Sequence, residues 1–146
     1  MWQKLNAMPY FFDDSMRNPY SFEAIITAPT TLCFLLGGPP ALGIAYAFGL
    51  DKDDKGEGFG FGCAVAIWDK TAMRHVDLIG IAIKSVFASH WKPRRAFALI
   101  CSKNTLGLRF AMHLGFIKEG DIRQGLRYHS RWEDVTLMGV LREEVI

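Results

Sequence analysis

The sequence predicts a single α/β domain built around a mixed β-sheet. Three short β-forming runs follow one another directly in the first half of the chain, which favours an antiparallel meander. In the second half, β-forming runs alternate with amphipathic helical stretches, which favours a parallel crossover. No linker, internal repeat or low-complexity segment divides the 146 residues. A chain of this length can bury a substantial core, so we expect one domain spanning residues 1–146.

The composition narrows the class of protein. Half of the residues are hydrophobic and 22% are charged, which is typical of a globular chain. The net charge of +2 is too small to indicate a specific nucleic-acid partner or an anionic membrane. No run reaches the roughly 18 consecutive apolar residues of a spanning helix, and the N-terminus lacks the layout of a signal peptide. We therefore expect a cytoplasmic protein.

The three cysteines are odd in number and stand far apart in apolar runs: Cys33, Cys63 and Cys101. This pattern favours buried, reduced thiols in a cytosolic protein. No Cys/His spacing resembles a zinc site, so we expect no metal.

The helical and β-forming patterns place nine elements after an N-terminal segment without a clear pattern. Residues 1–12 are rich in aromatic and apolar side chains but show no clean period, so a short helix, a strand and an arm that packs on a protein partner through residues 2–12 all remain open. Pro29, Pro93 and Gly115 end the three helices. The expected elements are a helix at 20–27, strands at 31–36, 41–49 and 59–68, a helix at 76–91, a strand at 95–101, a helix at 104–114, and strands at 116–127 and 134–142.

Several residues between positions 101 and 144 stand in a fixed order: Asn104, the tripeptide Leu114-Gly115-Phe116, the pair Glu119-Gly120, Asp134, and a closing Leu-Met-Gly-Val-Leu-Arg-Glu-Glu run. This ordered set resembles the C-terminal half of the GNAT superfamily of N-acetyltransferases, in the style of the ribosomal-protein-alanine acetyltransferases. The resemblance covers about residues 57–144 by motif and residues 13–144 by element order. It implies a GNAT-like domain whose mixed central sheet has about six to seven strands with helices on both faces.

The resemblance also implies acetyl-CoA as cosubstrate, with its pantetheine arm between two central strands that splay apart. The pyrophosphate would rest on backbone N–H groups at the start of the helix that follows, because free donors and the helix dipole attract an anion. A backbone N–H near Ile67 would hold the thioester carbonyl, and Asn104 would contact the pantetheine arm or cap its own helix. The cofactor-binding residues implied in this way are Ile67, Arg74, His75, Leu78, Ile79 and Asn104.

The pyrophosphate loop departs from the family pattern. Arg74 and Leu78 match it, but His75 and Asp77 stand at its two glycine positions. Asp77 brings a negative charge to the phosphate site and equally well caps the first turn of its own helix. Two outcomes remain open: the cradle is impaired or lost, or it works through Lys70, Arg74 and a shifted loop.

The family's catalytic groups are only partly represented. Its usual general acid is a tyrosine five residues before the Phe of Gly-Phe, and Ala111 stands there. Gly107 occupies a position where a serine is common. A general base needs a pKa moved toward neutrality, and the candidates are Glu57, at the start of the fourth family strand, and His75.

Two functions are therefore predicted. The first is acetyl-CoA-dependent N-acetyl transfer to an unidentified small-molecule or protein amine acceptor. The alternative is a catalytically inactive GNAT fold used for binding or assembly, such as a phage virion structural or morphogenesis component, which would place the protein in the virion. The glycine-less loop, Ala111 and the short aromatic N-terminus favour this alternative. The sequence leaves the acceptor, the oligomeric state and the host open.

Overall fold

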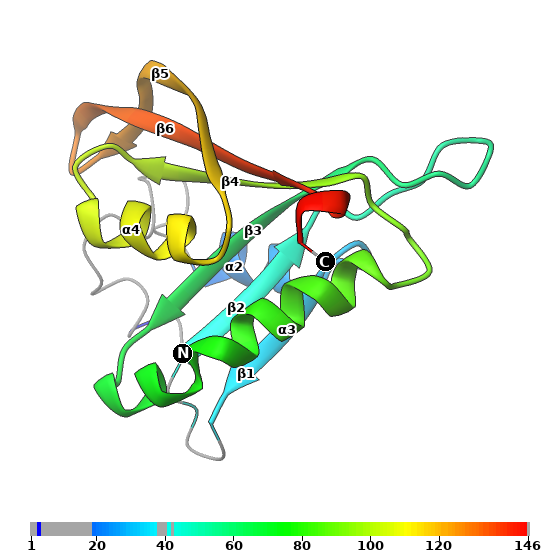
Figure 1. Ribbon diagram of the computed structural model, residues 1–146. Coiled ribbons are helices and arrows are strands. Elements are labelled where there is room, and N and C mark those ends of the chain that lie inside the picture. Colours follow the sequence, from blue (N-terminus) through cyan, green and yellow to red (C-terminus); the bar gives the residue numbers. More distant parts are fainter. Residues whose placement is uncertain (1–2, 4–18, 38–40, 42, 146) are drawn as a thin grey trace.

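The computed structural model describes residue 3, residues 19–37, residue 41 and residues 43–145, apart from the side chains of Ala72, Met73, His75 and Val76. The described part is a six-stranded sheet with helices on both faces (Figure 1). The elements, in chain order, are α2 (Pro19–Ile26), β1 (Leu32–Leu36), β2 (Gly43–Phe48), β3 (Gly60–Ile67), η2 (Lys70–His75), α3 (Val76–Phe87), β4 (Arg95–Cys101), α4 (Thr105–His113), β5 (Ile117–Tyr128), β6 (Arg131–Leu141) and η3 (Arg142–Glu144).

The sheet is mixed, as predicted. Its strand order is β1-β2-β3-β4-β6-β5. The first three strands pair antiparallel as a meander. Strands β3 and β4 pair parallel, and α3 connects them, because parallel neighbours need a crossover. Strand β6 lies between β4 and β5 and pairs antiparallel with both. The predicted α/β class and element order are therefore confirmed.

The sheet carries a different layer on each face. Helices α3 and α4 lie in front of it in the view of Figure 1, and α2 lies behind. The larger core joins α3 to the front face through side chains such as Ile79, Val86 and Met138, each about 1% exposed. The smaller core packs Phe22 of α2 on Tyr46 of β2 with an edge-to-face geometry. Each helix thus buries its apolar stripe against one face of the sheet.

Two element boundaries differ from the prediction by more than two residues. Helix α3 ends at Phe87 instead of residue 91, because the backbone N–H and the Oγ of Ser89 both donate to the carbonyl of Val86 and close the last turn early. Strand β6 begins at Arg131 instead of residue 134. His129 and Ser130, both with positive φ, form the two-residue turn that joins β5 to β6. Such turns match the natural twist of a hairpin.

The expectation for one cysteine is wrong. Cys101 is buried and Cys63 is partly buried, but Cys33 is exposed. Cys33 lies on β1, an edge strand on which successive side chains alternate between the two faces of the sheet. Apart from residue 3, the predicted arm at residues 1–12 and its partner contact at residues 2–12 lie outside the described residues. In the described part, no helix is long and apolar enough to cross a membrane.

Candidate functional site

The sheet splits between β3 and β4. These strands pair at only three positions, the last being Gly62 with Phe97. Beyond that point β3 stays paired with β2 as far as Ile67, and β4 stays paired with β6 as far as Cys101. The two halves of the sheet therefore diverge toward the carboxyl ends of both strands. Along the split, the facing backbone groups of β3 have no strand partner among the described residues and can pair with a ligand.

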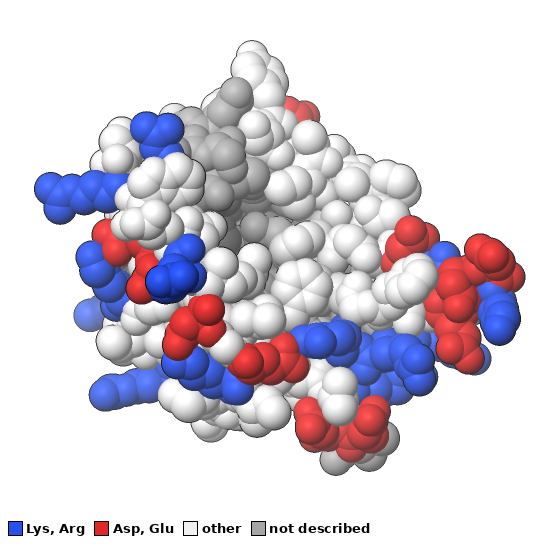
Figure 2. Space-filling view, turned by 90° about the horizontal axis from the view of Figure 1, so that it is seen from above, with Lys and Arg blue, Asp and Glu red and all other residues white. Residues whose placement is uncertain are grey.

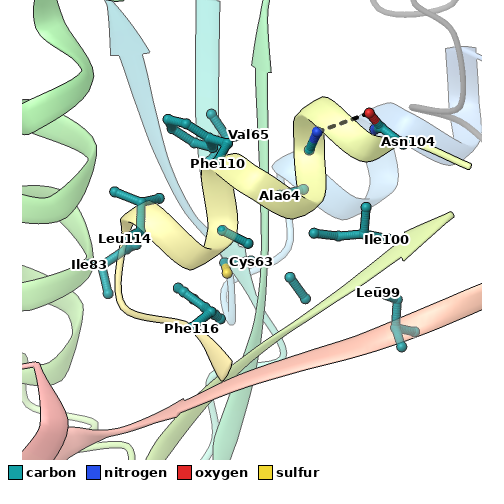
Figure 3. A pocket seen from close by; sticks show the side chains of 13 residues that line it. Cys63, Ala64, Val65, Ile83, Leu99, Ile100, Asn104, Phe110, Leu114 and Phe116 are labelled. Carbon is teal, nitrogen blue, oxygen red and sulfur yellow. Dashed lines mark hydrogen bonds between the residues drawn. The ribbon is translucent and has the colours of Figure 1, made fainter. Parts of the chain in front are cut away.

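A cavity of about 160 Å³ occupies the split, covered by α4 (Figure 3). Its walls come from β3, β4 and α4, with further side chains from α3 and from the turn before β5. Almost all of them are apolar, and several are small. The lining residues are Cys63, Ala64, Val65, Ile83, Ala98, Leu99, Ile100, Asn104, Gly107, Phe110, Ala111, Leu114 and Phe116. Such a cavity is a default binding site in an α/β protein, where ligands bind at the carboxyl ends of the strands.

Asn104 is the polar side chain among those that line the cavity, and it begins α4. Its Oδ1 accepts a hydrogen bond from the backbone N–H of Gly107 at 3.0 Å (Figure 3). A Cβ on Gly107 would lie 2.7 Å from Asn104 Nδ2, so glycine is required for this close contact. At the other end of α4, Gly115 has a φ of 92°, and the turn carries Phe116 back into the cavity wall.

A chain of polar groups holds the segment that leads into α4. The hydroxyls of Ser102 and Thr136 lie 2.9 Å apart, and Thr136 donates to Asp121 Oδ1 at 2.9 Å. A hydroxyl has one hydrogen to donate, so Ser102 must donate to Thr136. Hydrogen bonds from Lys118 and then from Thr136 lower the pKa of the Asp121 carboxyl below its ordinary value. The backbone N–H of Ser102 also donates to Asp134, so the start of α4 is fixed to β5 and β6.

Cys63 carries the one titratable side chain among the described residues that line the cavity. Its thiol donates to the carbonyl of Phe97 at 3.5 Å. Burial raises the pKa of this thiol to about 12, so Cys63 is neutral at physiological pH and is not an activated nucleophile. Ala111 is 6% exposed and presents only a methyl group.

The predicted pyrophosphate residues lie near the open end of the split. Residues 70–75 form η2 and lead directly into α3, close to where β3 ends. Arg74 and Asp77 are exposed, Leu78 is 49% exposed, and the side chain of Ile79 is buried in the larger core. Of the predicted residues with described side chains, Asn104 lines the cavity. The side chain of His75 lies outside the described part.

The two remaining candidates lie at opposite ends of β3. Ile67 is its last residue, partly buried against the larger core. Glu57 precedes the strand, in an exposed turn where its backbone N–H donates to Asp53 at 2.8 Å. The split opens at the Ile67 end, so Glu57 is remote from it. The side chains that sequence reasoning missed are mainly apolar, such as Val65, Ala98 and Phe110. In the sequence, such apolar residues cannot be told apart from residues of an ordinary hydrophobic core.

Searches with protein-family models and among curated proteins gave no match to this sequence. Solved structures do match. Spermidine N-acetyltransferase SpeG from Vibrio cholerae, in complex with CoA and spermine, aligns with a TM-score of 0.71 at 12% identity, covering 99% of this chain and 85% of that chain. A single-residue mutant of SpeG gives 0.69 at 14% identity, covering 91% and 77%. SpeG with manganese ions gives 0.64 at 16% identity, covering 89% and 75%.

The chain has the fold of the GNAT acetyltransferases. The similarity extends over nearly the whole chain, which confirms the fold class expected from the motif order. At 12% to 16% sequence identity, this similarity establishes the fold and no more. These matches give no support to the ribosomal-protein style, to a phage origin or to a place in the virion.

Proposed function

We propose that the protein is an acetyl-CoA-dependent N-acetyltransferase that acts on an amine. The observation that carries this proposal is the apolar cavity in the split between β3 and β4, covered by α4. One structure with the same fold, SpeG, is a complex with CoA and spermine. A narrow slot with backbone groups along one wall suits a flexible arm that contains both amides and alkyl segments.

The residues of the cavity fit the pantetheine arm in two respects. The unpaired edge of β3 beyond Gly62 offers backbone donors and acceptors that can pair with amide groups, as a strand would. Asn104 uses its Oδ1 for its own helix, which leaves Nδ2 to donate to an amide carbonyl. The predicted donor to the thioester carbonyl, a backbone N–H toward Ile67, lies on the same edge of β3.

The phosphates of the cosubstrate would lie at the start of α3. Lys70 and Arg74 are exposed there and supply two positive charges, while Asp77 supplies a negative one. Free N–H groups at a helix start favour an anion, but Asp77 competes for these donors. We therefore propose weak phosphate binding through Lys70 and Arg74, with the affinity coming mainly from the cavity.

The reaction needs a neutral amine. Its nitrogen attacks the thioester carbonyl, a C–N bond forms, the C–S bond breaks, the amine loses one proton and the departing thiolate gains one. The thiol of Cys63, with its pKa raised by burial to about 12, is unsuited to either transfer. The protein would therefore act by binding and orienting both reactants, and solvent would exchange the protons.

A thermal-shift titration tests this function. Saturating acetyl-CoA, at one hundred times Kd, should stabilise the fold by about 2.7 kcal/mol, which for this size raises Tm by about 5–10 °C. ATP is the control, because it carries an adenine nucleotide without a pantetheine arm. Release of free CoA thiol in the presence of an amine should follow. The absence of any shift at millimolar acetyl-CoA would refute the proposal.

A further inference from the structure

One face of the sheet carries exposed apolar side chains next to the split. Strand pairing sets two rows on this face. Phe48, Gly62, Phe97, Gly139 and Ile117 form one row, and Leu99, Leu137 and Gly120 form the next. Met138 and Val140 point to the opposite side of the sheet, into the larger core. The rows therefore lie on the face away from α3 and α4. We call the part of this face over β4, β6 and β5 the acceptor face.

The acceptor face carries three well-exposed apolar side chains beside an ion pair between Arg95 and Glu119, whose carboxylate lies over Gly139. Leu99 is 58% exposed, Ile117 is 57% exposed and Ile122 is 45% exposed. Leu137 and Phe97 are partly buried beside them. Among the described helices, α2 shares this side of the sheet but packs on β2. Exposed apolar side chains that form one contiguous patch mark a binding surface more often than apolar side chains that are exposed singly.

Leu99 connects the acceptor face to the cavity. It is one of the residues that line the cavity, yet more than half of its surface is exposed. Figure 3 shows Leu99 on the opposite side of β4 from Ile100 and Asn104. Leu99 therefore belongs both to the cavity lining and to the acceptor face, beside the point where β3 and β4 separate.

The carboxylates of β5 and β6 already have partners. Glu119 pairs with Arg95, Asp121 pairs with Lys118 at 2.6 Å, and Glu133 pairs with Lys103 at 2.7 Å. Asp134 accepts the backbone N–H of Gln124 at 2.9 Å. Figure 2, which looks down on the molecule from above the view of Figure 1, shows acidic side chains lying next to basic ones.

A ligand with several ammonium groups is bound best by several carboxylates that lack other cationic partners. Among the described residues, the carboxylates of the acceptor face are paired with basic side chains, and the exposed surface beside them is apolar. We propose that the acceptor is a primary amine attached to an apolar group, which rests on Leu99, Leu137 and Ile122, and that a polyamine such as spermine is a poor acceptor. This inference rests on the proposed acetyl transfer and names the acceptor class for the same site.

The test compares two amines with acetyl-CoA as donor. The full chain should acetylate 2-phenylethylamine with a kcat/KM at least tenfold above that for spermine. Leu99→Ala should raise KM for 2-phenylethylamine about fivefold with kcat little changed, because it removes apolar contact area. Leu35→Ala is the matched control, since Leu35 is also 58% exposed but lies on β1. Ile122→Ala is a second, independent test of whether the acceptor face contacts the amine.

The outcomes separate this inference from the proposed function. If acetyl-CoA raises Tm but spermine is the better acceptor, acetyl transfer stands and the apolar acceptor is refuted. The same conclusion follows if Leu99→Ala and Leu35→Ala have equal KM values. If acetyl-CoA causes no shift, both the function and the acceptor class are refuted. Both leucines are exposed, so the variants should fold, and unchanged Tm values would confirm this.

Discussion

At the scale of single residues, Asn104 has two separable tasks. Its Oδ1 caps α4, and its Nδ2 is the side-chain donor available to a ligand in the proposed function. An aspartate keeps the first task because it is as good a cap as asparagine, but it replaces the amide donor with a carboxylate oxygen. The two tasks can therefore be measured in different variants.

We expect Asn104→Asp to retain the Tm of the parent and to lose most of the stabilisation by acetyl-CoA. Asn104→Ala should lose both, with about 1 kcal/mol of stability removed together with the cap. Thermal unfolding with and without acetyl-CoA measures both effects. An aspartate variant that responds to acetyl-CoA like the parent would show that Nδ2 makes no contact with the ligand.

Asp121 links the stability of the α4 start to pH. Its folded pKa is lowered from the ordinary value of 3.8 by Lys118 and then by Thr136, so the stabilisation is present above pH 3.8 and is lost as the pH falls through the folded pKa. Asp121 is exposed, so solvent keeps the effect small. Asp121→Asn should reduce Tm at pH 7 and reduce its loss below pH 4. Parallel acid limbs for parent and variant would contradict this.

At the scale of elements, α4 is built around a glycine that a helix would ordinarily avoid. Glycine inside a helix costs about 1 kcal/mol relative to alanine, yet Gly107 is needed where the side chain of Asn104 folds back. Gly80 in α3 is the opposite case, because a Cβ added there would meet nothing within 4 Å. Alanine substitutions at Gly107 and Gly80 can therefore be compared directly.

Gly80→Ala should therefore stabilise the protein by about 0.5–1 kcal/mol. Gly107→Ala should fail to stabilise it and should weaken acetyl-CoA binding, because the new methyl group displaces Asn104 from its cap position. Denaturant unfolding of both variants gives the comparison. A gain in stability at Gly107 equal to that at Gly80 would mean that the contact with Asn104 is easily relieved.

At the scale of the whole molecule, two half-sheets meet at a short seam. Three residue pairs join β3 to β4, while the pairings on either side run the full length of the shorter strands. A ligand in the split would bridge the two halves. In the proposed function the cosubstrate therefore completes the sheet, and its effect on backbone protection should be local.

Hydrogen exchange with and without acetyl-CoA should show this. Residues 63–67 of β3 and 98–101 of β4 should gain protection, since their facing backbone groups lie along the split. The distal end of the β5–β6 hairpin around residues 122–132 should change little and serves as the internal control. Protection spread evenly over the chain would indicate general stabilisation without a ligand in the split.

The local patterns in the sequence were sufficient for the elements but not for the site. Gly115 and the alternation in residues 59–68 correctly placed a turn and a strand, whereas the helix end predicted from Pro93 lies four residues beyond the observed end at Phe87. Asn104 was predicted because one residue type at a fixed spacing both caps a helix and resembles a family motif. The family resemblance implied a split between two central strands, but its position could not be predicted, because it depends on where pairing stops between strands more than 30 residues apart in sequence, at Gly62 and Phe97. Glu57 was a candidate because it stands at the start of the fourth family strand, and the sequence alone does not tell which end of that strand opens.

Within the described part of the chain, β5 is the last strand of the sheet, and this has a consequence for behaviour at high concentration. A strand of twelve residues with one edge exposed could recruit strands from other molecules. The register of β5 against β6 breaks twice, between Lys118 and Gly120 and between Ile122 and Leu126. Such bulges bend and twist the strand, and the charges of Lys118, Asp121 and Arg123 lie along it. The outermost strand is thereby a poor template, which protects the protein against edge-to-edge aggregation and fibril growth.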